Sequence, residues 1–328
     1  MAEAILPVRK IMDTDPAHKR ETHDSRYDQG SAFVVDHYCP VMEASVPLVS
    51  DLVLHSDVVY DAVSVSRGNF FRLDYHQERF ARSLNLVRMK HPFAQSQEAE
   101  ILHNLVAMTG LKDTCVFWMV SRQLKGERGH AANPDAWESH FYAFVIDYLF
   151  LNNDEQRTRG IDMIISKQLR ISPKAVDPRA KNFHWMDLNL SIHEAGDRGA
   201  EYSVLPNEDD NLTECPGSNI FLVKDGELFT PSSGCLEGGT RDAVIELCKD
   251  QGIRCHVTKV PSDQLRQADE AFMTSTAGGI MPINRVDGRL LGDQDGPGAI
   301  TTRLHNLYWE RRWDGWRALP VDYTRQVI

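Results

Sequence analysis

Residues 181–240 constrain the fold of this chain more than any other stretch. The lysine motif KNFHWMDL is followed by LTECPGSNIFLVKDGELFTP and then by CLEGGTRDAVIELC. An Asp-Gly pair separates the apolar runs NIFLV and ELFT, and this pattern is the strongest short signal for a β-hairpin. A Gly-Gly-Thr sequence then precedes apolar residues at helical spacing, which predicts the start of a helix. The stretch therefore predicts a mixed α/β fold in which a strand pair leads into a helix.

The residues on either side of this stretch predict two domains. In the first half, VVYDAVSVSRGNFFRL and TCVFWMVSR have the pattern of strands, while YHQERFARSLNLVRM and EAEILHNLVAM carry apolar residues at helical spacing. GERGHAANPDAWES is expected to form a loop, and LNNDEQRTRG a linker. The second half alternates strands such as IDMIIS and AFMTS with helices expected near 185–198, 241–251 and 298–311. We expect an N-terminal arm at 1–30, a small α/β domain at 31–150, a linker at 151–158 and a larger domain at 159–328.

The composition is that of a folded protein without a nucleic-acid or membrane partner. With 36 basic and 47 acidic residues, the chain of 328 carries a formal net charge of −11, which argues against binding to a nucleic-acid backbone. The first residues, MAEAILPVRK, lack a long apolar segment, and no apolar run reaches the roughly 18–20 residues that a membrane span needs. None of the six cysteines forms a CxxC pair. We therefore expect reduced thiols, no metal site and a cytoplasmic protein.

Lys181 is the strongest candidate for a reactive amine. Phe183 and Trp185 give it an apolar, aromatic setting. A lysine that forms a Schiff base must be positioned, desolvated and accessible, and this setting favours all three. Lys174 is the nearest rival, but it lies in the Pro-bounded loop SPKAVDP, where a solvated surface charge is the simpler explanation.

Glu214 and the predicted helix start supply two further groups. Glu214 lies at a Gly-rich strand entry, where its carboxylate can stabilise a cationic ring nitrogen. Gly238, Gly239 and Thr240 present backbone N–H groups and the positive end of the helix dipole, which favour a dianion. Taken alone, the Glu214 motif or the Gly-Gly-Thr motif would be explained more simply as an ordinary turn. An amine, a carboxylate and an anion-binding helix end in this order are groups that can hold a phosphorylated pyridine aldehyde.

Other side chains extend the predicted anion site. Ser275 and Thr276 in TSTAGGIMPI can donate hydroxyl groups, and Ala277 can offer its backbone to a substrate carboxylate. Arg79 lies one helical turn from His76, and its guanidinium fits phosphate oxygens bidentately. A surface arginine would be the ordinary explanation for Arg79 in isolation.

The wording of these motifs resembles the fold-type IV pyridoxal 5′-phosphate (PLP) enzymes, which include branched-chain aminotransferases, D-amino acid aminotransferases and (R)-selective amine transaminases. TECPGSNIF is similar to the family signature EGSGxNxF, LEGGTR to L-x-G-[aliphatic]-T-R, and RLDYHQER to the motif around the family's phosphate arginine. The resemblance implies a D-amino acid aminotransferase-like fold with PLP as cofactor. It implies Lys181 as the catalytic Schiff-base lysine, Glu214 beside the ring nitrogen, and a phosphate site formed by Arg79, Gly238, Gly239, Thr240, Ser275 and Thr276.

The closest resemblance is to the (R)-selective amine transaminases. LHSDVVYDAVSV matches their wording around a histidine and a tyrosine, and SRQLKGERG resembles their mobile loop. The arginine of that loop would swing in to pair with a keto acid in one half-reaction and swing out for an apolar amine in the other. The implied substrate residues are His55, Tyr60, Cys115, Phe117, Arg128, Trp185 and Ala277.

Two departures from the family pattern affect the predicted pocket. Phe117 stands where (R)-amine transaminases often carry Glu and where branched-chain enzymes tend to have arginine at one end of the triplet. It therefore makes the pocket more apolar. Met186 follows Trp185 where related enzymes carry Gly, or Tyr in branched-chain enzymes, so the partner of the cofactor's phenolic oxygen stays open.

These features predict a PLP-dependent aminotransferase that moves an amino group from an (R)-amine or a D-amino acid to a keto acid such as pyruvate. The resemblance implies a homodimer whose active sites lie at the domain and subunit interface. The alternatives are a D-amino acid or branched-chain-type amino acid aminotransferase, a lyase of the aminodeoxychorismate type, and a cofactor-free scaffold on this fold. Retention of Lys181 and Glu214 argues against the scaffold.

Overall fold

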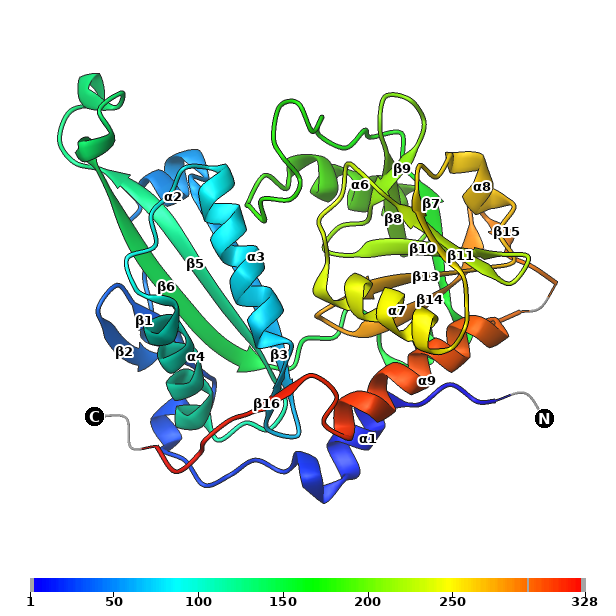
Figure 1. Ribbon diagram of the computed structural model, residues 1–328, viewed down its shortest axis with the longest axis horizontal. Coiled ribbons are helices and arrows are strands. Elements are labelled where there is room, and N and C mark those ends of the chain that lie inside the picture. The colour runs from blue at the N-terminus through cyan, green and yellow to red at the C-terminus, as the bar shows by residue number, and fades with distance from the viewer. Residues whose placement is uncertain (1–2, 294, 326–328) are drawn as a thin grey trace. The chain divides into compact units, whose positions relative to one another are not determined.

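The computed structural model describes residues 3–293 and 295–325, and for Arg128 it describes the backbone only. The chain forms two compact units, each built around its own β-sheet (Figure 1). The mixed α/β fold predicted from the sequence is confirmed. The first unit comprises the described residues up to Asp13, Phe150–Arg179 and Trp185–Asp314, and the second comprises Thr14–Leu149, Ala180–His184 and the described residues from Gly315 onward.

The second unit contains an antiparallel sheet of seven strands in the order β16-β4-β3-β5-β6-β1-β2. Its strands are β1 (Ser31–Val34), β2 (His37–Pro40), β3 (Val58–Ser66), β4 (Asn69–Phe71), β5 (Thr114–Leu124), β6 (Trp137–Asp147) and β16 (Ala318–Pro320). Its helices are α2 (Asp51–His55), α3 (Leu73–Leu86) and α4 (Gln95–Thr109), with the short 3-10 helices η1 (Pro16–His18), η2 (Ser25–Tyr27), η3 (Val41–Glu43), η4 (Arg128–His130) and η5 (Pro134–Ala136).

Side chains alternate between the two faces of this sheet, so each strand contributes to two surfaces. On one face Val63, Val116 and Trp118 pack with Phe80 of α3 and Leu105 of α4 in a fully buried core. The Phe80 and Trp118 rings meet edge to face with centroids 5.8 Å apart. Burying side chains of this size contributes about 1.5–3 kcal/mol each. The opposite face carries Tyr60, Ala62, Phe117 and Phe144.

The first unit contains a mixed sheet in the order β12-β11-β10-β13-β14-β7-β8-β9, with β15 paired to β14. Its strands are β7 (Ile161–Ile165), β8 (Tyr202–Pro206), β9 (Leu212–Glu214), β10 (Asn219–Lys224), β11 (Glu227–Pro231), β12 (Cys255–Thr258), β13 (Glu270–Ser275), β14 (Gly279–Val286) and β15 (Arg289–Leu290). Its helices are α1 (Val8–Thr14), α5 (Asp154–Arg159), α6 (Met186–Asp197), α7 (Gly239–Asp250), α8 (Ser262–Arg266) and α9 (Ala299–Trp313).

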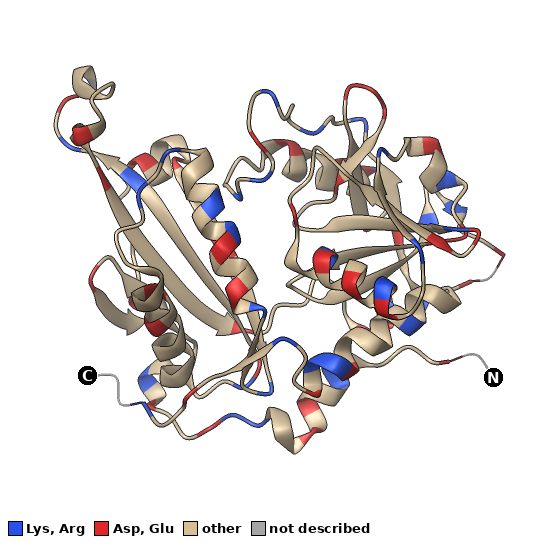
Figure 2. Ribbon diagram, in the orientation of Figure 1, with Lys and Arg blue, Asp and Glu red and all other residues tan. Residues whose placement is uncertain are grey.

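Both faces of the sheet in the first unit are covered, which explains why its strands are almost continuously apolar. Ile220 and Met273 lie in a buried cluster on one face. On the other face, Phe221 and Phe272 stack with centroids 5.1 Å apart where α7 and α9 pack against the sheet. Charged residues lie mainly on helices, loops and strand ends of both units (Figure 2).

The strongest local signals predicted these elements correctly. The Asp-Gly hairpin joins β10 and β11 with Lys224 opposite Glu227, as a two-residue turn requires. The helices expected near 185–198, 241–251 and 298–311 are α6, α7 and α9.

Three segments expected to be irregular contain regular structure. Residues 1–30 include α1, and the Nε of Arg20 donates to the Thr109 carbonyl at 2.6 Å. The linker expected at 151–158 contains α5, which begins with a capping box between Asn153 and Gln156. β6 begins at Trp137, inside the loop expected at 126–139. Residues 1–30 are held by contacts with distant parts of the chain, such as Thr109. Of the three segments, only 151–158 contained a local sequence signal for its structure, the capping box.

Two kinds of feature are absent from the described residues. No described helix is long and apolar enough to cross a membrane. In the same part of the chain, no group of three or more His, Cys, Asp or Glu side chains could hold a metal ion.

Candidate active site

The predicted site residues fall into two sets, one in each unit. The second unit holds Lys181, Arg79, His55, Tyr60, Cys115, Phe117 and Arg128, whose side chain lies outside what the structure describes. The first unit holds Glu214, Gly238, Gly239, Thr240, Ser275, Thr276, Ala277 and Trp185.

Lys181 lies against the open edge of β3. β4 pairs only with the last residues of β3, so the edge before them is available to another segment. The Tyr60 amide donates to the Lys181 carbonyl at 3.0 Å, and Val59 forms an antiparallel bridge with Asn182. The Lys181 amide in turn donates to the Ser83 hydroxyl at 3.2 Å. A backbone bridge to β3 and a hydrogen bond to the Ser83 side chain therefore hold the lysine segment on the sheet.

The Lys181 ammonium sits over an aromatic ring. Its Nζ is 4.4 Å from the centroid of the Tyr60 ring, and Phe183 packs on the same ring at 4.9 Å. A cation over a ring face gains electrostatic stabilisation of about 0.5–2 kcal/mol. The aromatic setting expected from the sequence is present, with Tyr60 and Phe183 as its members.

Tyr60 and Phe117 share one face of the sheet. Phe117 lies opposite Ala62 and stacks on Phe144, with centroids 5.0 Å apart and planes 11° apart. Tyr60, two residues before Ala62, points to the same side. The result is an apolar aromatic wall next to Lys181.

Cys115 and His55 have other surroundings. Cys115 is buried, and its Sγ accepts a hydrogen bond from the Leu149 amide at 3.4 Å. His55 lies at the end of α2, where its Nδ1 is 2.8 Å from Asp51 Oδ1. Its side chain is exposed while that of Asp51 is buried, so His55 is oriented by Asp51.

Arg79 belongs to a buried charged cluster that the sequence did not reveal. Its Nε donates to Asp61 Oδ2 at 2.8 Å and its Nη2 to Asp61 Oδ1 at 2.6 Å. His76 Nδ1 lies 2.8 Å from Asp61 Oδ1. All three side chains are almost completely shielded from solvent. The guanidinium that the sequence assigned to a phosphate is therefore aligned bidentately by a carboxylate.

Burial and pairing set the charges of this cluster. Burial raises the pKa of Asp61, but Arg79 and His76 outweigh it and hold that pKa well below its ordinary value. Burial lowers the pKa of His76 more than Asp61 raises it, so the imidazole is neutral near pH 7. His76 Nδ1 also lies 3.1 Å from Arg79 Nη2, and a hydrogen bond to Asp61, which can only accept, requires the ring proton on Nδ1.

Glu214 lies at the end of β9, where both of its oxygens have a donor. The Nε of Arg170 donates to Oε1 at 2.9 Å, and the Leu236 amide donates to Oε2 at 3.0 Å. Arg170 also donates through Nη1 to Asp187 Oδ2 at 2.6 Å. Burial lowers the pKa of Arg170, but Glu214 and Asp187 outweigh it and raise that pKa, so the guanidinium stays charged.

The residues after Glu214 form a tight turn. Cys215 and Ser218 exchange backbone hydrogen bonds of 2.9 and 3.0 Å across Pro216 and Gly217. Gly217 has φ of +68°, and Pro followed by a residue with positive φ is the pattern of a type II turn. Cys215 and Pro216, which depart from the family signature, therefore still permit the turn. The hydroxyl of the partly buried Tyr202 donates to the Pro216 carbonyl and holds the turn in place.

The start of α7 is shaped by the contact between Gly238 and Asn219. A Cβ at Gly238 would lie 2.1 Å from Asn219 Oδ1, so any larger residue would force Asn219 or the backbone to shift. Asn219 Nδ2 donates to the Leu236 carbonyl at 2.7 Å. As the N-cap residue, Gly238 has no side chain that could cap the helix, and α7 continues through Gly239 and Thr240. Such a helix start favours an anion.

Ser275 and its neighbours connect two turns of the first unit. The Ser275 hydroxyl donates to the Gly217 carbonyl at 2.9 Å and accepts from the Ala277 amide at 3.2 Å. Its only proton therefore serves the turn. Thr276 follows directly, and Trp185 approaches within 3.3 Å of a Cβ placed on Gly217.

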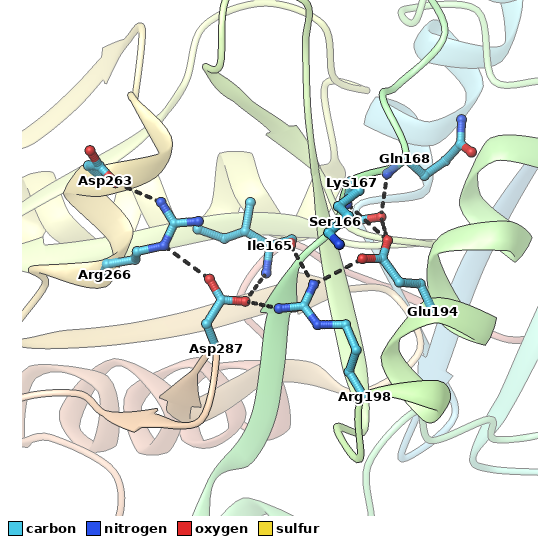
Figure 3. A network of polar contacts seen from close by, with 9 residues as sticks. All are labelled: Ile165, Ser166, Lys167, Gln168, Glu194, Arg198, Asp263, Arg266 and Asp287. Atoms are coloured by element: carbon cyan, nitrogen blue, oxygen red, sulfur yellow. Dashed lines mark hydrogen bonds and ion pairs between the residues drawn. The ribbon is translucent and has the colours of Figure 1, made fainter.

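A polar network holds the loop that carries Arg170 (Figure 3). Glu194 of α6 accepts from the Ser166 hydroxyl at 2.5 Å and from the Lys167 amide at 2.9 Å. Arg198 joins Glu194 to Asp287, at 2.9 and 2.7 Å. The loop after β7 is therefore anchored before it reaches Arg170.

Sequence reasoning assigned no role to Asp61 and Arg170, and it included Asp187 and Asn219 only as letters of the lysine motif and of the family signature. Asp61 had a signal, because it is the one charged residue in the apolar strand Val58–Ser66. Arg170 lies on a separate segment, and no local pattern relates it to Glu214.

Comparison with known proteins identifies the family. The model described as amino-transferase class IV matches residues 58–286, so the chain belongs to the class IV aminotransferases and is an enzyme. The branched-chain-amino-acid aminotransferase of Pseudomonas aeruginosa is 28% identical over 243 residues, which are 73% of this chain and 78% of that protein. The D-alanine aminotransferase of Listeria monocytogenes is 27% identical over 279 residues, 84% of this chain and 94% of that protein.

A solved structure agrees with the family assignment. It is a branched-chain amino acid aminotransferase with pyridoxamine 5′-phosphate, and it superimposes with a TM-score of 0.82 at 26% sequence identity. The match covers 90% of this chain and 99% of that chain. Class IV aminotransferases use PLP as cofactor.

The groups described above fit that cofactor. Lys181 offers an amine in an aromatic setting, and Glu214 offers a carboxylate held by two donors. Gly238 leaves a helix start without side-chain obstruction.

Proposed function

We propose that this chain moves an amino group from an (R)-amine, or from a D-amino acid, to a keto acid such as pyruvate. When bound, PLP supplies a carbonyl that reacts with amines and a ring that withdraws electrons. In the proposal, Lys181 Nζ holds the cofactor and moves a proton at the substrate carbon as general base and then as general acid. Glu214 holds the proton on the ring nitrogen.

The phosphate is assigned to Gly238, Gly239 and Thr240 at the start of α7. Their backbone and the helix dipole favour the dianion. Thr276 and Arg79 are proposed to add a hydroxyl and a guanidinium. Asp61 would contribute indirectly by keeping that guanidinium oriented. Ser275 would support this site mainly through its bond to Gly217.

The observation that carries the amine specificity is the aromatic wall beside Lys181. Tyr60, Phe117 and Phe144 share one face of the sheet, and Phe117 stacks on Phe144. An apolar wall favours a substrate whose carbon next to the amine carries hydrocarbon groups, because burying apolar surface contributes about 25 cal/mol per Å². Cys115, Trp185 and Ala277 are proposed to complete the substrate site, with His55 at its margin. Arg128 is proposed to bind the keto acid carboxylate.

An amino acid aminotransferase is the second candidate. Relatives named D-alanine aminotransferase and branched-chain-amino-acid aminotransferase match most of this chain. Such an enzyme needs a permanent carboxylate site. Arg128→Ala should then abolish turnover of every donor, whereas in the amine transaminase it should impair only the keto acid half-reaction.

A half-reaction experiment separates these possibilities. Protein loaded with PLP is mixed with (R)- or (S)-1-phenylethylamine, D-alanine or L-alanine, and conversion of the cofactor to its pyridoxamine form is followed by absorbance. Conversion by the (R)-amine supports the proposal. Conversion by only one alanine enantiomer selects an amino acid enzyme of that configuration. Bound cofactor with no conversion by any donor would point to a lyase.

Lys181→Ala tests the catalytic assignment. The variant should lose the half-reaction, and borohydride reduction should no longer attach the cofactor to the protein. Lys174→Ala is the matched control, because it removes a lysine from the preceding exposed loop. Full turnover by Lys181→Ala would sink the assignment.

A homodimer is also proposed, on the basis of several exposed apolar side chains in one short segment of the sequence. Met42, Leu48 and Val49 are 75, 79 and 83% exposed, and Val53 and Leu54 of α2 lie close by in the sequence. Several large apolar side chains exposed in one segment favour a protein interface there. Leu48→Glu should convert a dimer to a monomer in light scattering, while Leu319→Glu, at a separate exposed leucine, should not.

A further inference from the structure

Arg170 lies between two carboxylates in a shielded part of the first unit. Its Nε contacts Glu214 Oε1 at 2.9 Å, and its Nη1 contacts Asp187 Oδ2 at 2.6 Å. The side chains of Arg170, Glu214 and Asp187 are 8, 9 and 13% exposed. Charges in such an environment are screened weakly by solvent, so each group affects the other two.

Three separate segments position this acid–arginine–acid cluster. Arg170 lies in the loop after β7, and its amide donates to the Pro206 carbonyl at 2.9 Å. Asp187 lies in the first turn of α6, and its Oδ2 also accepts from the Ile171 amide at 2.7 Å. The guanidinium is therefore held from both sides, and its bond to Glu214 is not a chance surface contact.

The cluster carries a net charge of −1, because two carboxylates surround one guanidinium. Without Asp187, Glu214 and Arg170 would form a neutral pair with a weak attraction for a cation. Without Arg170, two carboxylates would remain without their shared counter-ion. Asp187 and Arg170 thus have opposite electrostatic effects at Glu214.

Other titratable groups near Glu214 do not alter this balance. Burial raises the pKa of the Cys215 thiol well above its ordinary value, and it raises the pKa of Cys235 to about 12. Both thiols are therefore neutral near pH 7. Arg241 and Glu237 also face Cys235, and they carry opposite charges.

We propose that Arg170 and Asp187 are positioning residues that set how strongly Glu214 holds a proton on the ring nitrogen of the cofactor. This inference rests on the proposed function. Arg170 orients the Glu214 carboxylate, and its positive charge weakens the attraction of Glu214 for the ring proton. The negative charge of Asp187 partly offsets that effect. Neither residue has to touch the reacting atoms, so their effect reaches the reaction only through Glu214.

The test uses protein loaded with PLP labelled with ¹⁵N in the ring. The ¹⁵N chemical shift reports whether the ring nitrogen carries a proton, and it is measured from pH 6 to pH 9. In Asp187→Asn the acid dissociation constant of the ring nitrogen should be about tenfold larger than in the wild type. In Arg170→Gln this constant should be about tenfold smaller. In Arg170→Lys it should lie close to the wild-type value.

Two variants serve as matched controls. Asp197→Asn removes an exposed carboxylate from the same helix α6, and Arg179→Gln removes an exposed guanidinium from the same chain segment. Neither should shift the ring nitrogen resonance. If Arg170→Gln fails to fold, Asp187→Asn and Arg170→Lys still decide the matter.

Shifts in the same direction for Asp187→Asn and Arg170→Gln would overturn the proposal, and so would no shift beyond the controls, because both results describe a purely structural role. Failure of the proposed function is detected separately. In that case the wild-type protein would not bind PLP, or borohydride would not attach the cofactor to Lys181.

Discussion

Replacing Asp61 by asparagine should destabilise this protein strongly, because it leaves the Arg79 charge buried without its counter-ion. Arg79 binds Asp61 at 2.6 and 2.8 Å, and the two side chains are 3 and 0% exposed. Breaking one partner of a buried ion pair costs about 3–5 kcal/mol. The new amide would still accept one hydrogen bond, so we expect a loss of about 3 kcal/mol. At about 2–4 °C per kcal/mol, the midpoint of thermal unfolding should fall by about 6–12 °C.

A second pair in the same unit provides the control. Arg122 binds Asp57 with the same bidentate geometry, at 2.8 and 2.9 Å, but these side chains are 29 and 21% exposed. Asp57→Asn should therefore cost about 1 kcal/mol or less. Urea titrations of both variants without cofactor measure the difference, because the phosphate proposed to bind Arg79 would otherwise act as a second counter-ion. If Asp61→Asn loses no more stability than Asp57→Asn, burial is not what makes the Asp61 pair strong.

The pH dependence of the Asp61 contribution follows from the direction of its shift. Burial raises the pKa of Asp61, but Arg79 and His76 outweigh it and keep the folded-state pKa below the unfolded value of about 3.9. The contribution is thus complete above about pH 4 and is lost only as the pH falls through the folded-state pKa. Acid titrations should show this component in the wild type and not in Asp61→Asn.

Further predictions concern glycine packing and a buried histidine. Gly238→Ala would place a Cβ 2.1 Å from Asn219 Oδ1, so it should cost about 1–3 kcal/mol in urea unfolding and weaken PLP binding. Gly196→Ala, in α6 with nothing within 4 Å of its Cβ, should instead stabilise the protein by about 0.5–1 kcal/mol. Burial lowers the pKa of His305 to about 4, so the unfolded chain binds a proton between about pH 6.5 and 4 that the folded chain does not. The unfolding free energy of the wild type should therefore fall by about 3 kcal/mol as the pH is lowered from about 6.5 to about 4. Urea titrations at these two pH values should show no such loss for His305→Gln.

Local signals explain which parts of the fold could be predicted from the sequence. The β10–β11 hairpin and α7 follow from an Asp-Gly turn and a helical apolar pattern, both of which act over a few residues. β16 has only three residues, and its partner β4 lies far away in the sequence. No local pattern specifies such a pairing. The same reason applies to Leu6, whose amide is bound by the side chain of Asn306.

The candidate site shows the same division. Glu214 and Gly238 could be proposed from their motifs, because turns and helix starts have local signatures. Arg170 could not, because its significance depends on Glu214 and Asp187, which lie on two other segments. Phe117 was expected to make a pocket more apolar, and its stacking on Phe144 gives that expectation a structural basis without identifying the substrate.

The placement of Ala180–His184 on the edge of β3 affects how the chain must be made. Ribosomes synthesise β3 and β5 well before Lys181, and β3 exposes unpaired N–H and C=O groups until Tyr60 can bind the Lys181 carbonyl. Unpaired strand edges can pair with other chains, so the nascent protein passes through an aggregation-prone period. The edge of β4 stays open even longer, until Ala318–Pro320 has been synthesised. Chaperone binding that covers these edges during this period should therefore raise the yield of folded protein, whereas slower translation would prolong their exposure.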